Sequence, residues 1–281
     1  MKGLRAVASL TLALFVGSVL AGGPAAVRKQ VESTLLVTGT VDIEPDGTVG
    51  GYTLDRGAEL PPVVTALLDK ATPTWKFEPV EVAGKPARVR TAMSVRLVAR
   101  RAETGEGFDV RIAAGNFGNP DEEGSLASES LKPPTYPMDA ASAGVYGTVY
   151  VIVRVGRNGN VEDAIAEQVN MKVIDSEAGL ERWRRVLAKA AVRGAGAWKF
   201  TPPTRGDEVD APFWLARVPV DFVAHDSKPL KYGEWEAYVP GPRQSTPWLG
   251  AMNTSLGADA VANGSIQPLG TGPKLLTPIG G

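Results

Sequence analysis

A pentapeptide that occurs twice is the feature of this 281-residue sequence that most constrains its fold. Residues 75–79 read Trp-Lys-Phe-Glu-Pro, and residues 198–202 read Trp-Lys-Phe-Thr-Pro. Upstream, residues 41–49 align with residues 153–161 around an Asp-Gly turn and an Asn-Gly turn. Similar elements that return in the same order are typical of internal repeats. The sequence therefore predicts two copies of one small domain.

The two copies, residues 33–101 and 131–224, share one order of predicted elements. Each reads strand, strand, helix, strand, because alternating apolar residues give way to helical spacing and then return. Glycine-containing turns join the first two strands of each copy. The clearest strands are 35–43, 49–54, 89–97, 149–155 and 213–222, and the helices are 63–71 and 183–191. The fold class predicted is α+β, with two small units, each a three-stranded antiparallel sheet packed by one or two helices.

The aromatic residues of the repeated pentapeptide lie two positions apart, so each pair shares one face of a strand. Packing against the helix is the simplest use of such a pair. We therefore predict that the structural core includes Trp75, Phe77, Trp198 and Phe200.

The remaining segments lack this regular pattern. Residues 102–130 are rich in glycine and acidic residues and read as a linker, with a short strand at Phe108–Ile112 as a further candidate element. Residues 224–281 hold nine glycines and seven prolines among 58 residues. That composition predicts a low-complexity, disordered tail over residues 225–281. Only the second copy carries the rigid stretch Lys132–Pro137, followed by a short predicted helix.

The N-terminus has the pattern of a secretory signal peptide. Lys2 and Arg5 precede sixteen uncharged residues, and small residues suit cleavage after Ala21. A spanning helix needs roughly 20 apolar residues, and Gly22 and Gly23 end this run early. Residues 1–21 are therefore predicted to be removed and the chain to be exported to an oxidising compartment, with a retained membrane anchor as the alternative.

The composition excludes several classes of function. The chain has no cysteine, one histidine and a formal net charge of −1. Disulfides, thiolate metal sites and multi-histidine metal clusters are excluded, and a balanced charge disfavours nucleic acid as a partner. The sequence contains no phosphate-binding loop and no nucleophile elbow. We therefore predict a protein that is not an enzyme and that uses no cofactor and no metal.

An ordered series of motifs in the second copy resembles the C-terminal domain of TonB-family energy transducers. The series is Pro134-x-Tyr136-Pro137, Gly147-x-Val149-x-Val151, Asn158-Gly159-x-Val161 and Trp198-x-Phe200-x-Pro202, followed by an alternating final strand. The resemblance covers about a third of the chain, and the first copy looks like a shortened relative that lacks the Tyr-Pro helix. It implies a periplasmic domain of Gram-negative bacteria that binds the N-terminal motif of outer-membrane receptors.

The resemblance also implies where such a partner would bind. The receptor segment would pair as an added strand beside the last strand and the stretch before the Tyr-Pro helix. The implied partner-binding residues are Pro133, Pro134, Tyr136, Pro137, Ala216, Val218, Val220 and Phe222. The implied partners are outer-membrane TonB-dependent receptors or other envelope proteins, and a second copy of the chain is a further candidate.

Two features depart from the family's transducers. The apolar N-terminal run contains no histidine, and the linker before Leu131 holds one proline, Pro120, where transducers carry a long Pro-rich spacer. A periplasmic protein-binding module, linked to TonB-dependent transport, is the resulting prediction. The alternative is a structural envelope protein without a transport role. An open sheet edge favours the first, and a covered edge favours the second.

Overall fold

A computed structural model describes residues 22–118, 124–206, 208–223, 227–228, 230–248, 261 and 265–280. The predicted signal peptide, residues 1–21, lies outside these residues. Every strand pairing within them is antiparallel. Helices and antiparallel sheets together give a mixed architecture of the predicted α+β class.

The first sheet is built from the N-terminal part of the chain. The order β12-β1-β5-β6 is completed by β2, which also pairs with β1. The bounds are β1 (Glu32–Ile43), β2 (Val49–Leu54), β5 (Val89–Arg101), β6 (Phe108–Phe117) and β12 (Glu236–Tyr238). Strands β1 and β5 form the long centre, where twelve residue pairs run from Glu32↔Arg100 to Ile43↔Val89.

The second sheet has the order β13-β11-β8-β9. Its bounds are β8 (Gly147–Gly156), β9 (Val161–Met171), β11 (Phe213–Phe222) and β13 (Gln267–Leu269). Strand β8 is buried at nearly every position because a helix covers one face of the sheet and other parts of the chain cover the opposite face.

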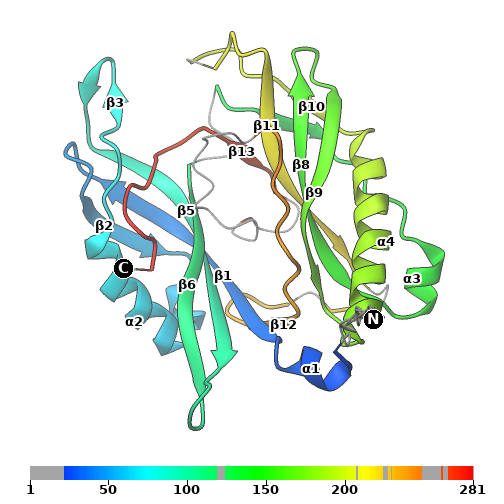
Figure 1. Cartoon of the computed structure of the whole chain (residues 1–281). Helices are drawn as coiled ribbons and strands as arrows, with labels where there is room; N and C mark the ends of the chain where they lie inside the picture. Colours follow the sequence, from blue (N-terminus) through cyan, green and yellow to red (C-terminus); the bar gives the residue numbers. More distant parts are fainter. Residues whose placement is uncertain are drawn as a thin grey trace, which may run out of the picture.

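Each sheet carries one main helix on its outer side (Figure 1). Helix α2 (Pro62–Ala71) buries Val64 and Leu68, and a proline suits its first turn. Helix α4 (Glu177–Ala195) is capped by Ser176, whose hydroxyl oxygen accepts a hydrogen bond from the Gly179 amide at 3.1 Å. Its apolar stripe packs on the sheet. The stripe consists of Leu180, Trp183, Leu187, Ala191 and Ala195.

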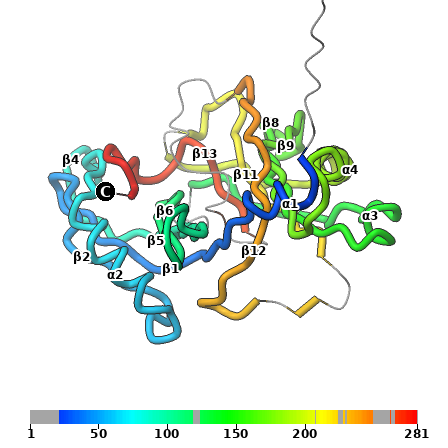
Figure 2. Tube along the Cα trace, turned by 60° about the horizontal axis from the view of Figure 1, so that its bottom comes forward, coloured from blue at the N-terminus to red at the C-terminus, as the bar shows by residue number. Residues whose placement is uncertain are grey.

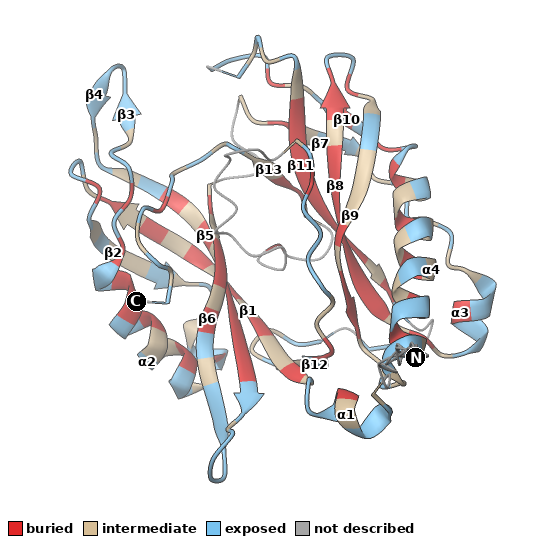
Figure 3. Ribbon diagram, in the orientation of Figure 1, coloured by how far each residue is buried: buried red, intermediate tan, exposed pale blue. Residues whose placement is uncertain are grey.

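Two hydrophobic cores lie between these helices and their sheets (Figure 3). Trp75 and Phe77 belong to the first core and Trp198 and Phe200 to the second, and none of the four is more than 2% exposed. The repeated pentapeptide therefore supplies the aromatic centre of each core, where the sequence placed it.

The turn glycines explain why the repeat includes an Asp-Gly and an Asn-Gly turn. Gly47 has φ +85° and Gly159 has φ +75°. A Cβ at Gly47 would lie 2.0 Å from the Phe77 carbonyl oxygen, and one at Gly159 would lie 2.1 Å from that of Phe200. The Gly47 carbonyl accepts a hydrogen bond from the Phe77 amide at 2.8 Å, and the Gly159 carbonyl accepts one from the Phe200 amide at 2.9 Å. Only glycine fits at either turn.

The remaining elements are short. They are α1 (Pro24–Arg28), the 3-10 turns η1 (Gly57–Glu59) and η2 (Thr72–Thr74), β3 (Glu81–Val82), β4 (Lys85–Pro86), β7 (Ala127–Ser130), α3 (Met138–Ser142) and β10 (Lys199–Thr201). Strands β3 and β4 form a hairpin, and β7 pairs with β10.

The sheets are larger than the predicted three strands because segments assigned to linker and tail join them. Strand β6 lies within the predicted linker and pairs with β5 over nine residue pairs. The predicted disordered tail contributes β12 to the first sheet and β13 to the second. Figure 2 shows this segment, coloured orange to red, running from one sheet to the other.

The described part of the tail pairs with both sheets through its backbone. Val239 exchanges two hydrogen bonds with Met171 at the end of β9, at 3.0 and 2.7 Å, and the Gln244 amide donates to the Glu167 carbonyl at 2.7 Å. Farther on, the Leu276 amide donates to the Lys76 carbonyl at 2.8 Å. The expectation of a tail without structure was wrong for these residues, because main-chain pairing needs no hydrophobic periodicity.

Candidate functional site

The Tyr-Pro segment is fixed against the end of β11, the last strand of the second copy. The Tyr136 hydroxyl donates to the Val145 carbonyl, and its ring meets Phe222 of β11 edge-on, with ring centroids 5.3 Å apart. Burial raises the pKa of the Tyr136 phenol. Pro134 lies against Gly194 of α4, where a Cβ would be 2.6 Å from the proline ring. Pro133 is exposed, and Pro137 precedes α3.

The four predicted contact residues on β11 face the interior. Ala216, Val218, Val220 and Phe222 are at most 7% exposed, and their side chains belong to the second core. A partner could therefore meet this strand only through its main chain or through the alternate side chains.

Two prolines show which main-chain groups of β11 point to its outer edge. Pro219 is paired with Tyr150 of β8, and Pro268 of β13 is paired with Ala216. Proline has no N–H, so both pairs are of the type that exchanges no hydrogen bonds in an antiparallel ladder. The even-numbered residues of β11 therefore bond to β8. The outer edge belongs to odd-numbered residues such as Leu215, Arg217 and Pro219.

Strand β13 occupies a part of this edge whose main-chain groups can both donate and accept hydrogen bonds. It pairs with Leu215, Ala216 and Arg217 in an antiparallel register. Beyond Arg217, the next edge position is Pro219, which offers no donor. The sequence predicted the last strand of the second copy as an edge, but the chain's own C-terminal segment lies on it.

A buried ionic network, which the sequence did not indicate, lies next to the pairing of β11 with β13. Glu167 of β9 is fully buried, and the Arg217 guanidinium meets it with two hydrogen bonds, Nε–Oε2 at 2.6 Å and Nη2–Oε1 at 3.0 Å. Arg243 of the tail also contacts Oε1, through Nε at 2.8 Å. Sequence alternation placed Arg217 opposite the core face, which normally means solvent. The tail covers that face and buries it.

The same network continues into the other sheet. The second Arg217 nitrogen, Nη1, donates to Gln267 Oε1 at 2.7 Å, and Gln267 Nε2 donates to Asn116 Oδ1 of β6 at 2.7 Å. Gln267 is 2% exposed. One chain of polar contacts thus joins β9, β11, the tail and β6.

The two pentapeptide tryptophans make matching hydrogen bonds. Trp198 Nε1 donates to the Lys132 carbonyl at 2.8 Å, and Trp75 Nε1 donates to the Ile279 carbonyl at 2.9 Å. Four residues before each acceptor, an extended residue pairs with the phenylalanine of the pentapeptide. These residues are Ser128, paired with Phe200, and Leu275, paired with Phe77. The tail therefore supplies to the first sheet what the segment before the Tyr-Pro motif supplies to the second.

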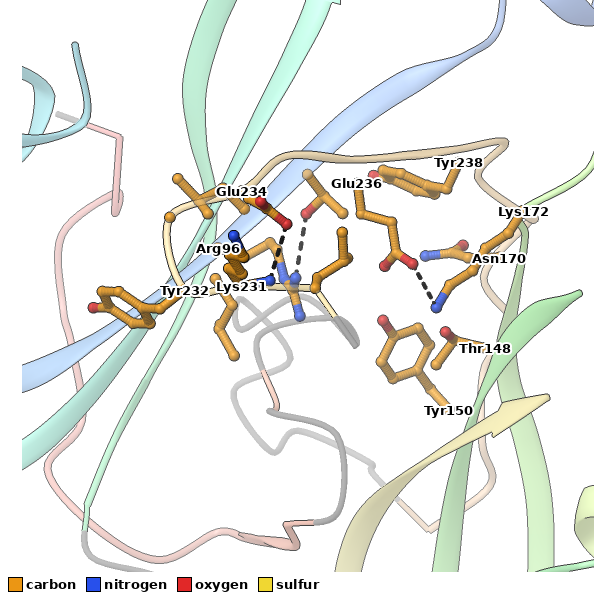
Figure 4. Close-up of a pocket in the computed structure, with 15 residues that line it drawn as sticks. Arg96, Thr148, Tyr150, Asn170, Lys172, Lys231, Tyr232, Glu234, Glu236 and Tyr238 are labelled. Atoms are coloured by element: carbon orange, nitrogen blue, oxygen red, sulfur yellow. Dashed lines mark hydrogen bonds and ion pairs between the residues drawn. The ribbon is translucent and has the colours of Figure 1, made fainter. Parts of the chain in front are cut away.

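A polar pocket of about 160 Å³ lies where the tail bridges the sheets (Figure 4). Several of its charged groups have partners close by. Lys172 contacts Glu236 at 2.8 Å and Asp221 at 3.2 Å, and the Lys231 amide donates to Glu234 at 2.9 Å. Within the described ranges no group of His, Cys, Asp and Glu side chains could hold a metal ion. The hydroxyl of Thr148, which also lines the pocket, donates to Asp221.

None of the helices in the described part of the chain combines the length and the apolar character that crossing a membrane requires.

The second sheet is antiparallel and carries one long helix. A Tyr-Pro segment is fixed at the end of β11, and the outer edge of β11 accepts another strand. Together these features define a small α+β strand-pairing domain. Residues 132–224 match the family described as the Gram-negative bacterial TonB protein C-terminal. This segment is therefore a TonB-family C-terminal domain. The prediction that the chain is not an enzyme agrees with this family match.

The similar proteins are TonB proteins themselves. Protein TonB from two strains of Xanthomonas campestris pv. campestris is 35% identical to this chain over 97 residues, which is 34% of this chain and 37% of each relative. The alignment thus spans little more than a third of the relatives' length. No solved structure matches the chain.

Proposed function

We propose that this chain is a periplasmic, TonB-like protein-binding protein that captures an extended segment of an outer-membrane TonB-dependent receptor by strand addition. The observation that carries the proposal is the last strand of the TonB-type domain, whose outer edge accepts an antiparallel strand in this structure. Backbone pairing of this kind is a recurring mode of peptide recognition. Tyr136 lies beside the end of the same strand.

The odd-numbered main-chain groups of β11 give a sharp test of this mode. Leu215→Pro removes an outer-edge donor, whereas Leu215→Ala keeps it. Labelled peptides from the N-terminal segments of TonB-dependent receptors are titrated into both variants and the parent chain, with fluorescence anisotropy as the readout. We expect the parent and Leu215→Ala to bind in the micromolar range at best, about −8 kcal/mol, and Leu215→Pro to lose binding.

A second proline variant separates the edge from the fold. Ala216→Pro removes a donor that bonds to β8, so it is expected to unfold the second sheet rather than to block a peptide. Receptor peptides that bind Leu215→Pro as well as they bind Leu215→Ala would refute addition along this edge.

A structural envelope protein is the second candidate function. The covering of the β11 edge by β13 favours it, because natural sheets cover edges to avoid uncontrolled pairing. Absence of receptor-peptide binding by the folded parent chain, and also by a folded variant in which the pairing of β13 is weakened, would support this candidate.

We further propose that residues 33–101 are a shortened copy of residues 131–224, so that the chain is a tandem repeat followed by a C-terminal segment. The same strand order, β2-β1-β5 and β9-β8-β11, supports it. The matching glycine turns and tryptophan acceptors support it independently. Residues 102–130 then connect the copies, and residues 225–281 follow them.

Export is expected to remove residues 1–21. The first residue after the proposed cleavage is Gly22, whose nitrogen lies 2.9 Å from Glu177 Oε2 at the start of α4. Cleavage would turn this amide into an ammonium group, and a cation beside a carboxylate forms a stronger hydrogen bond. Intact-mass analysis of the periplasmic fraction is the measurement. A full-length species confined to the inner membrane would contradict the expectation and favour the anchored alternative.

A further inference from the structure

The C-terminal segment meets the edge of β11 with side chains as well as with backbone. Gln267 stands opposite Arg217, Pro268 opposite Ala216 and Leu269 opposite Leu215. Pro268 falls at a position where no N–H is needed. Leu269 packs on a small hydrophobic cluster that contains Ile152 and Leu215, together with Phe213 and Trp248.

Arg217 is held in one orientation, and that orientation points a donor at the added strand. Its Nε and Nη2 both bond to the buried Glu167 carboxylate. A guanidinium presents its donors in a rigid plane, so fixing two of its nitrogens fixes the third. The third, Nη1, lies 2.7 Å from the Gln267 side-chain oxygen. Both side chains are 2% exposed, so water cannot easily replace the glutamine.

A site built in this way discriminates among side chains. A strand with leucine opposite Arg217 would leave a buried, charged N–H without its acceptor, which is costly. Polar sites reject ligands that lack the complementary group more strongly than apolar pockets reject small changes in size. Asn116 Oδ1 adds to the selection, because it accepts from the amide nitrogen of the same glutamine.

We propose that Arg217 is the specificity-determining residue of the β11 edge. This edge accepts extended peptides that carry glutamine followed two residues later by an aliphatic residue. Residues 265–270 occupy the edge as an internal ligand. This inference rests on the proposed function in that it concerns the same edge. It adds what the edge selects and what must leave before a partner can bind.

The test uses the full chain and a probe taken from it, a fluorescein-labelled peptide Ser-Ile-Gln-Pro-Leu-Gly with the sequence of residues 265–270. Gln267→Ala weakens the internal ligand. We expect this variant to bind the probe at least tenfold more tightly than the parent chain, whose edge is occupied. A probe with leucine in place of glutamine is expected to bind the variant at least tenfold more weakly.

A second variant guards against loss of folding. Leu269→Ala loosens the same strand through its apolar contact and leaves Gln267 in place, and circular dichroism establishes that each variant is folded. Equal affinity of the folded variants for the glutamine and leucine probes would overturn the proposal, and so would an absence of probe binding by both. Since the probe is not a receptor peptide, a negative result with receptors alone leaves this inference standing and refutes only the proposed function.

Discussion

Trp198→Ala is expected to lower the free energy of unfolding by about 3–5 kcal/mol, because truncating a large aromatic residue in a core removes its buried surface and leaves a cavity. The side chain is 2% exposed and lies in the core between α4 and the second sheet. The substitution also leaves the Lys132 carbonyl without its indole donor. Small domains have only roughly 5–15 kcal/mol to lose, so the second sheet should be severely loosened. Urea denaturation followed by circular dichroism measures the change.

Trp198→Phe is the matched control. It keeps an aromatic ring and loses the indole hydrogen bond, so a smaller loss is expected than for alanine. Trp75→Ala should act on the first sheet in the same way, since Trp75 is 1% exposed and donates to Ile279. Unchanged unfolding of either alanine variant would show that these tryptophans contribute little to the cores.

Glu167→Gln is expected to cost about 3–5 kcal/mol, because removing one partner of a buried ion pair leaves an uncompensated charge in the interior. Two guanidinium groups, those of Arg217 and Arg243, contact this one carboxylate. Glutamine has nearly the size of glutamate, so the loss measures the charge and its hydrogen bonds rather than a cavity. Equilibrium denaturation of parent and variant gives the difference.

Glu181→Gln supplies the same chemical change at an exposed pair. Glu181 contacts Arg185 one turn along α4, and the two side chains are 70% and 66% exposed. Exposed helical pairs are worth about 0.3–0.5 kcal/mol. A Glu167→Gln variant no less stable than Glu181→Gln would mean that the buried network does not hold the tail on the second sheet.

The sequence predicted the parts of the fold whose pattern is local. Alternation along residues 213–222 predicted β11, and helical spacing of apolar residues predicted α2 and α4. The repeated pentapeptide predicted four aromatic residues that the structure buries. In each case the signal and the element occupy the same short stretch, so periodicity is sufficient.

The candidate site depended on contacts between distant segments. Nothing near Arg217 in the sequence distinguishes a buried arginine from a solvated one, because Gln267 and Glu167, which surround it, are each 50 residues away. The tail was read from its glycine and proline content, which reports missing periodicity and is silent about backbone pairing. Pro268 is one of the seven prolines whose number predicted a disordered tail, yet it occupies a strand position that needs no donor.

The hydrogen bond from Trp75 to Ile279 has a consequence for the order of events during synthesis. The two residues are 204 positions apart. At the usual pace of roughly 5–20 residues per second, about 10 to 40 seconds of translation separate the indole from its acceptor. Closing so long a loop costs little more than closing a shorter one, since the entropy grows only with the logarithm of length. The delay is therefore one of time rather than of stability. The sheet whose strands are synthesised first therefore receives its last segment only after the segments from β7 to β11 of the second sheet have been made.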